Sequence, residues 1–111
     1  MVYGVGVDTI AIERIQDSLK SERFERFAFS KRERAVFKRN SKKLAGCFAA
    51  KEALSKALGT GVRGFSLDEI SVLRDELGRP YFALEGAVKQ ILEEKRLTAH
   101  LSITNTEAEA T

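Results

Sequence analysis

The chain has 111 residues, of which 43% are hydrophobic and 32% are charged, and its formal net charge is +3. This composition is typical of a folded globular domain and excludes disordered, fibrous and bilayer-spanning chains. The sequence starts without a charged-then-apolar leader, and its single cysteine excludes an internal disulfide and a cysteine-only metal site. We therefore expect one domain over residues 1–111, located in the cytoplasm, with a mild positive charge that would suit an acidic partner.

The N-terminal segment from Val2 to Asp8 is predicted to be a strand because its residues alternate in character. Tyr3, Val5 and Val7 share one face, and two glycines share the other face with Asp8. The glycines leave the Asp8 face open to close approach by a ligand or by another element.

Two helices are expected after this strand. The first runs from about Ile10 to Lys20. An aromatic anchor of three phenylalanines follows it: Phe24, Phe27 and Phe29. Ser30 with Glu33 three residues on is a capping-box pattern, which predicts a second helix through about Arg39.

A long helix is predicted from Ser41, its expected cap, to Gly59, because strong helix formers dominate this stretch. Its apolar stripe consists of Leu44, Cys47, Phe48, Leu54 and Leu58. Lys51 falls in the middle of this stripe, Glu52 falls at its edge, and Lys56 lies one turn further on. One acid and two bases at the border of a buried face suggest a site rather than a solvated surface.

The sequence of the C-terminal half predicts a hairpin, then a helix and then a last strand. Ser66 to Arg74 and Pro80 to Leu84 are the expected hairpin strands, joined by a turn over Asp75 to Arg79. An amphipathic helix is expected over Gly86 to Arg96, and a strand over Thr98 to Ile103. The order β-α-α-α-β-β-α-β places the chain in the α+β class, with a mostly antiparallel sheet packed against helices.

Asp8 and Glu52 are the candidate metal ligands. Two carboxylates without a Cys or His partner suit Mg²⁺, which is commonly held by one or two carboxylates and by substrate phosphates. Spacing alone favours another interpretation, in which Asp8 caps a helix and Glu52 pairs with Lys56 on the surface. Lys51 and Lys56 could hold phosphate, or Lys51 could reach out of the stripe into solvent.

Two groups of basic residues could dock an acidic protein or a nucleic acid. The first comprises Lys31, Arg32, Arg34, Lys38, Arg39, Lys42 and Lys43. The second comprises Arg14, Lys20, Arg23 and Arg26. No aromatic RNA-binding signature accompanies them, which makes a nucleic acid the less favoured partner.

Several segments together carry a resemblance to a known family. They are Gly4-Val5-Gly6-Val7-Asp8, Phe48-Ala49-Ala50-Lys51-Glu52-Ala53 with Ser55-Lys56 and Leu58-Gly59-Thr60-Gly61, Gly78-Arg79-Pro80-Tyr81, and His100-Leu101-Ser102-Ile103-Thr104. With these segments in this order, nearly the whole chain resembles the holo-(acyl carrier protein) synthases, the small bacterial phosphopantetheinyl transferases.

The resemblance implies an enzyme that transfers 4′-phosphopantetheine from coenzyme A to a serine of apo acyl carrier protein, in fatty acid biosynthesis. It implies that Asp8 and Glu52 bind Mg²⁺ and that Lys56 lies near the CoA phosphates. The base that takes the serine proton is expected to be a metal-bound water or a nearby carboxylate, with Glu52 the better placed candidate.

The resemblance also implies where the partners bind. Gly78 and Pro80 are expected near the nucleotide of CoA. The acidic carrier protein is the expected partner of the basic residues around Arg14 and Arg23. A homotrimer with active sites at its subunit interfaces is expected, without a membrane role.

Two positions depart from the family pattern. The family usually has Arg before the Phe of the helix segment, where this chain has Cys47, and a second His after the Ser-Ile-Thr run, where this chain has Asn105. Asn donates hydrogen bonds but carries no charge, so a cofactor contact by Asn105 would be uncharged. The family also commonly continues into one more apolar strand, whereas this sequence stops at Thr111, so the chain is incomplete or the sheet edge is finished differently.

Two alternatives remain open from the sequence. One is a non-catalytic nucleic-acid-binding module that uses the basic cluster between Lys31 and Lys43. The other is an inactive relative that binds CoA or carrier protein without turnover, which the departures at Cys47 and Asn105 would permit.

Overall fold

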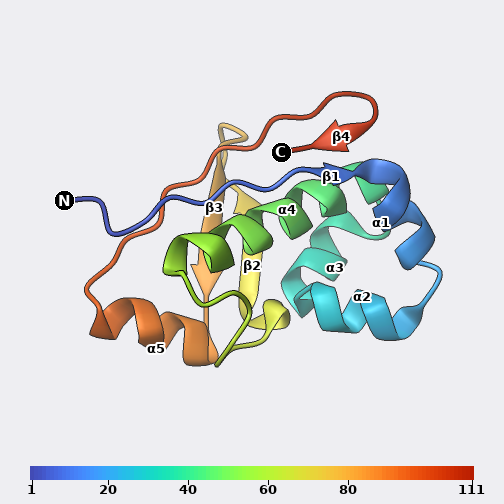
Figure 1. Ribbon diagram of the computed structural model, residues 1–111. Coiled ribbons are helices and arrows are strands. Elements are labelled where there is room, and N and C mark those ends of the chain that lie inside the picture. The colour runs from blue at the N-terminus through green and yellow to red at the C-terminus, as the bar shows by residue number, and fades with distance from the viewer.

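Helix α4 (Ser41–Leu58) is the longest element and crosses the middle of the computed structural model, which describes residues 1–111 (Figure 1). The other elements, in chain order, are β1 (Ile10–Ala11), α1 (Ile12–Ser18), α2 (Glu22–Ala28), α3 (Lys31–Phe37), the 3-10 turn η1 (Leu67–Glu69), β2 (Ile70–Arg74), β3 (Pro80–Leu84), α5 (Gly86–Glu94) and β4 (Glu109–Ala110). None of the helices has the length and apolar character needed to cross a membrane.

The strands form two small antiparallel sheets, which confirms the α+β class. β2 and β3 are a hairpin in register from Ile70 opposite Leu84 to Arg74 opposite Pro80. β1 pairs with β4, with Ile10 opposite Ala110. In Figure 1 the helices α1, α2 and α3 gather at one end of α4, and α5 lies at the other end.

The ends of α4 and α3 follow from local capping chemistry. Asn40, rather than the expected Ser41, caps α4, because its Oδ1 accepts a hydrogen bond from the Lys43 amide at 3.0 Å. Gly59 ends α4 in the left-handed conformation, with φ at 80°, as predicted. The capping box of α3 is also confirmed, and this helix stops at Phe37 rather than at Arg39.

The aromatic stretch after α1 is a helix that the sequence analysis did not predict. The Ser21 hydroxyl accepts a hydrogen bond from the Phe24 amide at 3.2 Å and so starts α2. The rings of Phe24, Phe29 and Phe48 lie 6.0–6.4 Å apart and join α2 to α4. Phe27 departs from the expected anchor, since its side chain points outward and the residue is 61% exposed.

Two predicted strands are not formed, and a third is shortened. The segments over residues 2–8 and 98–103 contain no strand, because neither makes a backbone ladder with a neighbour. The strand expected from Ser66 begins only at Ile70, since η1 precedes it. The Glu69 carboxylate accepts a hydrogen bond from the amide of Val88 at 3.3 Å, which ties this turn to the first turn of α5.

The core lies between α4, α1, the hairpin and α5. Its members include Ile15, Leu44, Ile70, Val72 and Val88, each of which is at most 1% exposed. This packing fixes one face of α4 and leaves another face toward the N-terminal segment, where the candidate site lies.

Candidate functional site

Asp8 and Lys56 meet at the outer face of α4. The Lys56 Nζ atom donates a hydrogen bond to Asp8 Oδ1 at 3.0 Å and another to the Val7 carbonyl at 3.1 Å. The side chain of Asp8 is 19% exposed and that of Lys56 is 56% exposed. The contact joins residues 48 positions apart and brings the first predicted ligand to the helix that carries the second.

The N-terminal segment reaches α4 because two of its residues are glycines. A Cβ atom at Gly4 would overlap the carbonyl oxygen of Ala57, and one at Gly6 would overlap that of Ala53. Both obstacles are helix backbone and cannot move aside. Glycine is therefore required at both positions for the backbone to lie on the helix, and this approach places Asp8 beside Lys56.

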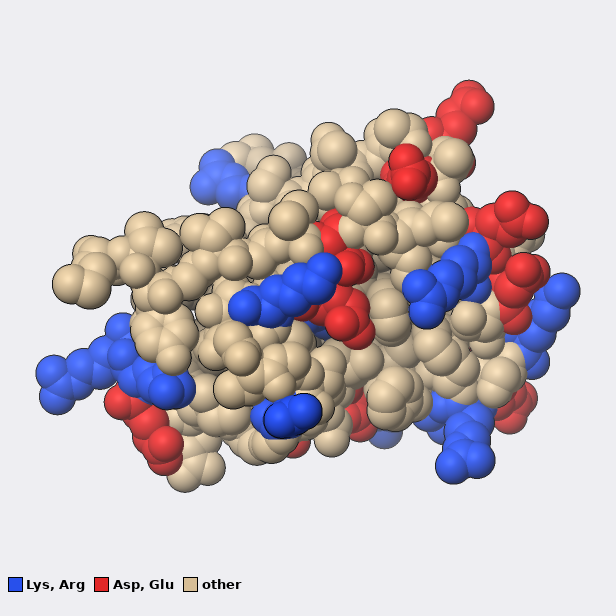
Figure 2. Space-filling model, viewed as in Figure 1, with Lys and Arg blue, Asp and Glu red and all other residues tan.

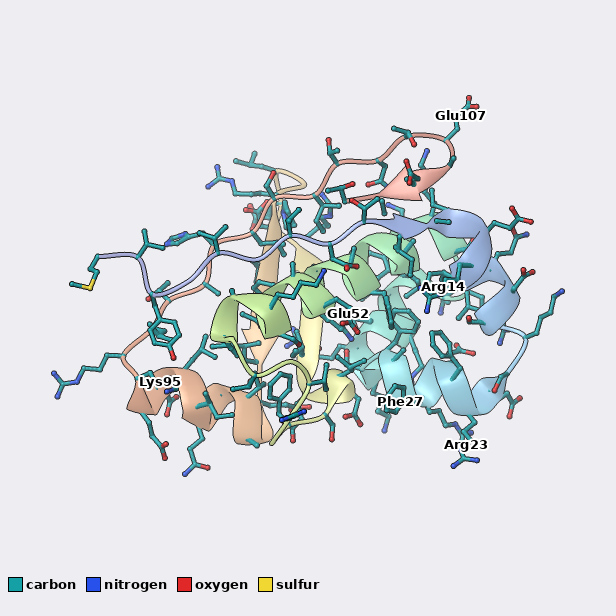
Figure 3. The ribbon with its side chains drawn as sticks, in the orientation of Figure 1. Arg14, Arg23, Phe27, Glu52, Lys95 and Glu107 are labelled. Carbon is teal, nitrogen blue, oxygen red and sulfur yellow. The ribbon has the colours of Figure 1, made fainter.

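Glu52 lies on the same helix, one turn before Lys56, and its side chain faces the viewer in Figure 3. It is half-buried and makes no hydrogen bond or ion pair within the chain, so its carboxylate is free for a ligand. At this place on the surface, Figure 2 shows acidic side chains beside a basic one. The surface ion pair between Glu52 and Lys56 that spacing alone favoured is not formed, since Lys56 pairs with Asp8.

The donor set here is two carboxylates without a third ligand. No group of three or more His, Cys, Asp or Glu side chains is positioned to hold a metal ion. A closed zinc site is therefore not built into the fold. Two carboxylates do fit Mg²⁺, because that ion usually keeps several waters and takes further oxygens from substrate phosphates.

A cavity of about 700 Å³ lies beside the N-terminal segment, and neither Glu52 nor Lys56 lines it. Residues 1–8 and 96–104 line it together with part of α4, and most of the lining is apolar. Asp8 stands at its border and is the one predicted metal ligand among its walls. The charged site and the cavity are thus neighbours that share one wall.

Lys51 has a structural role that excludes it from phosphate binding. Its side chain is fully buried, and Nζ donates hydrogen bonds to Glu33 Oε1 at 2.5 Å, to the Ala28 carbonyl at 2.7 Å and to the Leu67 carbonyl at 3.1 Å. Burial lowers the pKa of Lys51, and the Glu33 carboxylate acts against that shift. The interpretation in which Lys51 reaches into solvent is therefore wrong.

The three predicted cofactor-binding residues outside α4 make no hydrogen bond or ion pair with Asp8, although Asn105 lies near the strand that follows it, since Ala110 pairs with both Asn105 and Ile10. Gly78 has φ at 82° in the tip of the β2–β3 hairpin, where its carbonyl accepts a hydrogen bond from Arg74. Pro80 begins β3, and Asn105 forms an isolated bridge with Ala110. None of the three lines the cavity beside Asp8. Within one chain, Asp8 pairs with Lys56, Glu52 lies one turn before Lys56 on the same helix, and Gly78, Pro80 and Asn105 make no contact of this kind with them.

Cys47 is packed into the core, as its place on the apolar stripe predicted. The residue is 2% exposed, and its Sγ atom lies 3.6 Å from the Val72 carbonyl, to which it donates. Burial raises the pKa of the thiol, and the nearby Glu33 carboxylate raises it further.

Arg23 and Phe27 share the outer face of α2, and Arg14 projects from α1 beside them (Figure 3). The two residues on α2 are four positions apart, so they lie one above the other on the helix. The sequence analysis treated Phe27 as an anchor and did not connect it with the basic residues. That i, i+4 spacing was the available signal, but it could be used only once the stretch was known to be helical.

Comparisons with known proteins were made on the whole chain. Residues 4–106 match the sequence model described as the 4′-phosphopantetheinyl transferase superfamily. A holo-[acyl-carrier-protein] synthase of Clostridium perfringens is 42% identical over 99% of this chain and 90% of the relative.

Two solved structures are similar to the fold. The crystal structure of holo-[acyl-carrier-protein] synthase from Neisseria meningitidis has a TM-score of 0.91 and 34% identity, covering 99% of this chain and 94% of that one. A holo-(acyl-carrier-protein) synthase from Bacillus anthracis, in complex with CoA (3′,5′-ADP), has a TM-score of 0.83 and 34% identity, covering 99% and 91%.

Proposed function

Since this chain belongs to the 4′-phosphopantetheinyl transferase superfamily and is an enzyme of the holo-[acyl-carrier-protein] synthase family, we propose that it transfers 4′-phosphopantetheine from coenzyme A to a serine of apo acyl carrier protein. The reaction would depend on Mg²⁺ and would serve fatty acid biosynthesis in the cytoplasm. The single observation that carries the proposal is the meeting of Asp8, Glu52 and Lys56 at one face of α4.

Asp8 and Glu52 are the residues that would hold Mg²⁺. Glu52 has no partner within the chain, and Asp8 has one charged partner, so both retain oxygen lone pairs for a cation. When bound, the ion would neutralise charge on the diphosphate of CoA. Lys56 uses two of its three N–H donors on Asp8 and Val7, which leaves one for a phosphate oxygen.

The transfer itself needs positioning and charge neutralisation more than a protein nucleophile. The serine oxygen of the carrier protein forms a bond to the phosphorus that bears the pantetheine arm. The bond from that phosphorus to the oxygen of the nucleotide side breaks, and 3′,5′-ADP leaves. Glu52 is the residue that would take the serine proton, on the carboxylate oxygen that does not hold the ion.

The nucleotide end of CoA would lie at the hairpin tip of a second subunit. Gly78 and Pro80 are on the hairpin, and neither lines the cavity that Asp8 lines in one chain. A homotrimer with sites at its interfaces would bring these parts together. Its apolar contacts would include Tyr3, Val5 and Val7, which are 55%, 83% and 66% exposed.

The carrier protein would dock on the outer face of α1 and α2. Arg14 and Arg23 supply positive charge there, and Phe27 supplies an exposed aromatic side chain. An acidic partner would be attracted by these charges, and the ring would bury apolar area at the contact. Figure 2 shows basic and acidic side chains interspersed on the face in view.

The test is to incubate the whole protein with apo acyl carrier protein, CoA and Mg²⁺, and to weigh the carrier protein by intact mass spectrometry. The expected result is a mass gain of one phosphopantetheine group that disappears when a chelator is added. Retained CoA binding without a mass gain would favour the inactive relative. Salt-sensitive nucleic-acid binding without either would favour the nucleic-acid module.

A further inference from the structure

The buried Lys51–Glu33 pair links α4 to four other elements, namely α2, α3, η1 and β2. Lys51 uses all three of its donors, on α3 through Glu33, on the end of α2 through Ala28 and on η1 through Leu67. Its ammonium also lies 5.3 Å from the centre of the Phe29 ring. A fully buried ammonium with every donor satisfied is held in one geometry.

Glu33 completes the network from the other side. Its Oε1 atom accepts from the Ser30 amide at 2.8 Å, and Oε2 accepts from the Val72 amide at 2.9 Å. The carboxylate therefore holds the start of α3 and the middle of β2 as well as Lys51. Both side chains of the pair are 0% exposed.

Such a pair adds little to stability when compared with well-packed apolar residues, because burial of both charges is costly. What the pair adds is a set of directional hydrogen bonds, which restrict how α4 can be oriented. Apolar contacts along a helix tolerate small rotations and shifts, whereas hydrogen bonds to separate elements do not. The pair therefore defines the rotation of α4 relative to α2, α3 and β2.

Lys51 immediately precedes Glu52 in the chain, and Lys56 follows within the same helix. The helix is held on one side by the buried pair and on another by Gly4 and Gly6, whose backbone lies against its carbonyls. A rotation of α4 by about 20° would move a side-chain end about 5–6 Å from the helix axis by about 2 Å. A displacement of about 1 Å is enough to reduce catalysis by about a hundredfold.

We propose that the Lys51–Glu33 pair is a positioning device that sets Glu52 and Lys56 against Asp8 by fixing the rotation of α4. The inference rests on the proposed function, because it assigns a purpose to the exact placement of those three side chains. Lys51 itself touches neither substrate nor ion.

The test compares a double variant, Lys51→Met with Glu33→Gln, with the control Val88→Ala. The double variant removes both charges and so avoids an unpaired buried charge. Val88 is fully buried in α5 and takes no part in the network, so its truncation lowers stability without changing the pair. Lys51→Gln with Glu33→Gln is the milder variant, because it also removes both charges but keeps a side-chain amide at each position.

Each protein is assayed at a temperature that lies the same number of degrees below its own Tm, so that differences in stability do not affect the comparison of rates. The expected result for the double variant is a kcat at least about tenfold below that of the control, with the KM for CoA changed by about twofold or less. The KM is expected to hold because the nucleotide end is proposed to lie at the hairpin. Lys51→Gln with Glu33→Gln should give a smaller loss of kcat in the same direction, because the amides can replace part of the hydrogen bonding. A kcat equal to that of the control in both variants overturns the proposal.

A second readout does not depend on activity. Amide NMR shifts of Gly6, Asp8 and Lys56 should change in the double variant and stay unchanged in Val88→Ala. If shifts change only around Lys51, the pair does not position the site. If the wild-type protein transfers no phosphopantetheine, the proposed function fails, and the NMR comparison still decides whether the pair positions these residues.

Discussion

Lys56 is the residue whose role can be tested with the smallest change. Its ammonium holds Asp8 and the Val7 carbonyl, and its third donor is free. We expect Lys56→Gln to reduce kcat about a hundredfold, because the positive charge beside the diphosphate is lost. The carrier-protein mass assay, run as a time course, measures this change.

Lys89→Gln is the matched control for that substitution, since Lys89 is exposed on α5 and makes no ion pair. Its rate should remain that of the wild type. Full turnover by Lys56→Gln would show that the charge of Lys56 is not needed for transfer.

Cys47 gives a pH-dependent prediction. Burial raises the thiol pKa in the folded state, so the folded protein keeps a proton that the unfolded chain releases. The stability from this group is fully present below the ordinary thiol pKa, and it falls as pH rises above that value, by up to about 1.4 kcal/mol per pH unit. Urea unfolding between pH 7 and 10 should show this loss, and a Cys47→Ala variant should show a smaller slope.

Local sequence patterns predicted the contacts between residues that are close together in the sequence. The capping box of Ser30 and Glu33 spans three residues, and its chemistry requires no other part of the fold. The ion pair of Glu33 with Lys51 spans 18 residues, and only the packing of α3 against α4 brings its members together. The sequence therefore placed Lys51 correctly in the buried stripe but could not identify its partner.

At the scale of an element, the N-terminal segment is the most demanding part of the fold. Gly6→Ala should push this segment off α4, because the added Cβ would overlap the Ala53 carbonyl oxygen. We expect a loss of about 1–3 kcal/mol in the free energy of unfolding and a large fall in transfer activity. Val36→Ala is the control, since Val36 is 62% exposed on α3 and should change stability little. A Gly6→Ala protein with wild-type stability and activity would contradict the close packing.

The sequence predicted the elements whose pattern lies entirely within their own residues and does not depend on contacts with distant parts of the chain. The hairpin over Ile70–Arg74 and Pro80–Leu84 has alternating strands and a turn, and it is present in the expected place. The segment over residues 2–8 has the same alternation, yet its backbone packs on a helix instead of pairing with a strand. Alternation reports which residues share a face and does not report what covers that face.

At the scale of the whole molecule, the separation of the two halves of the proposed site is the main consequence of the fold. Asp8 and Glu52 lie at α4, whereas Pro80 lies on the hairpin. The sequence could assign all three residues to one function through resemblance, but distance within a single chain depends on the folded structure. The proposed homotrimer would join the two halves at an interface between two subunits, and this proposal can be tested by complementation.

Glu52→Gln should inactivate the metal half of the site, and Pro80→Asp should inactivate the nucleotide half by placing a negative charge beside the phosphates. Each variant alone is expected to be inactive. If the two halves come from different subunits, a mixture unfolded and refolded together should regain about a quarter of wild-type activity, because about a quarter of the interfaces then combine two intact halves. Refolding each variant separately before mixing is the control. An inactive co-refolded mixture would mean that both halves belong to the same subunit, since in that case no assembly of the two variants contains an intact site.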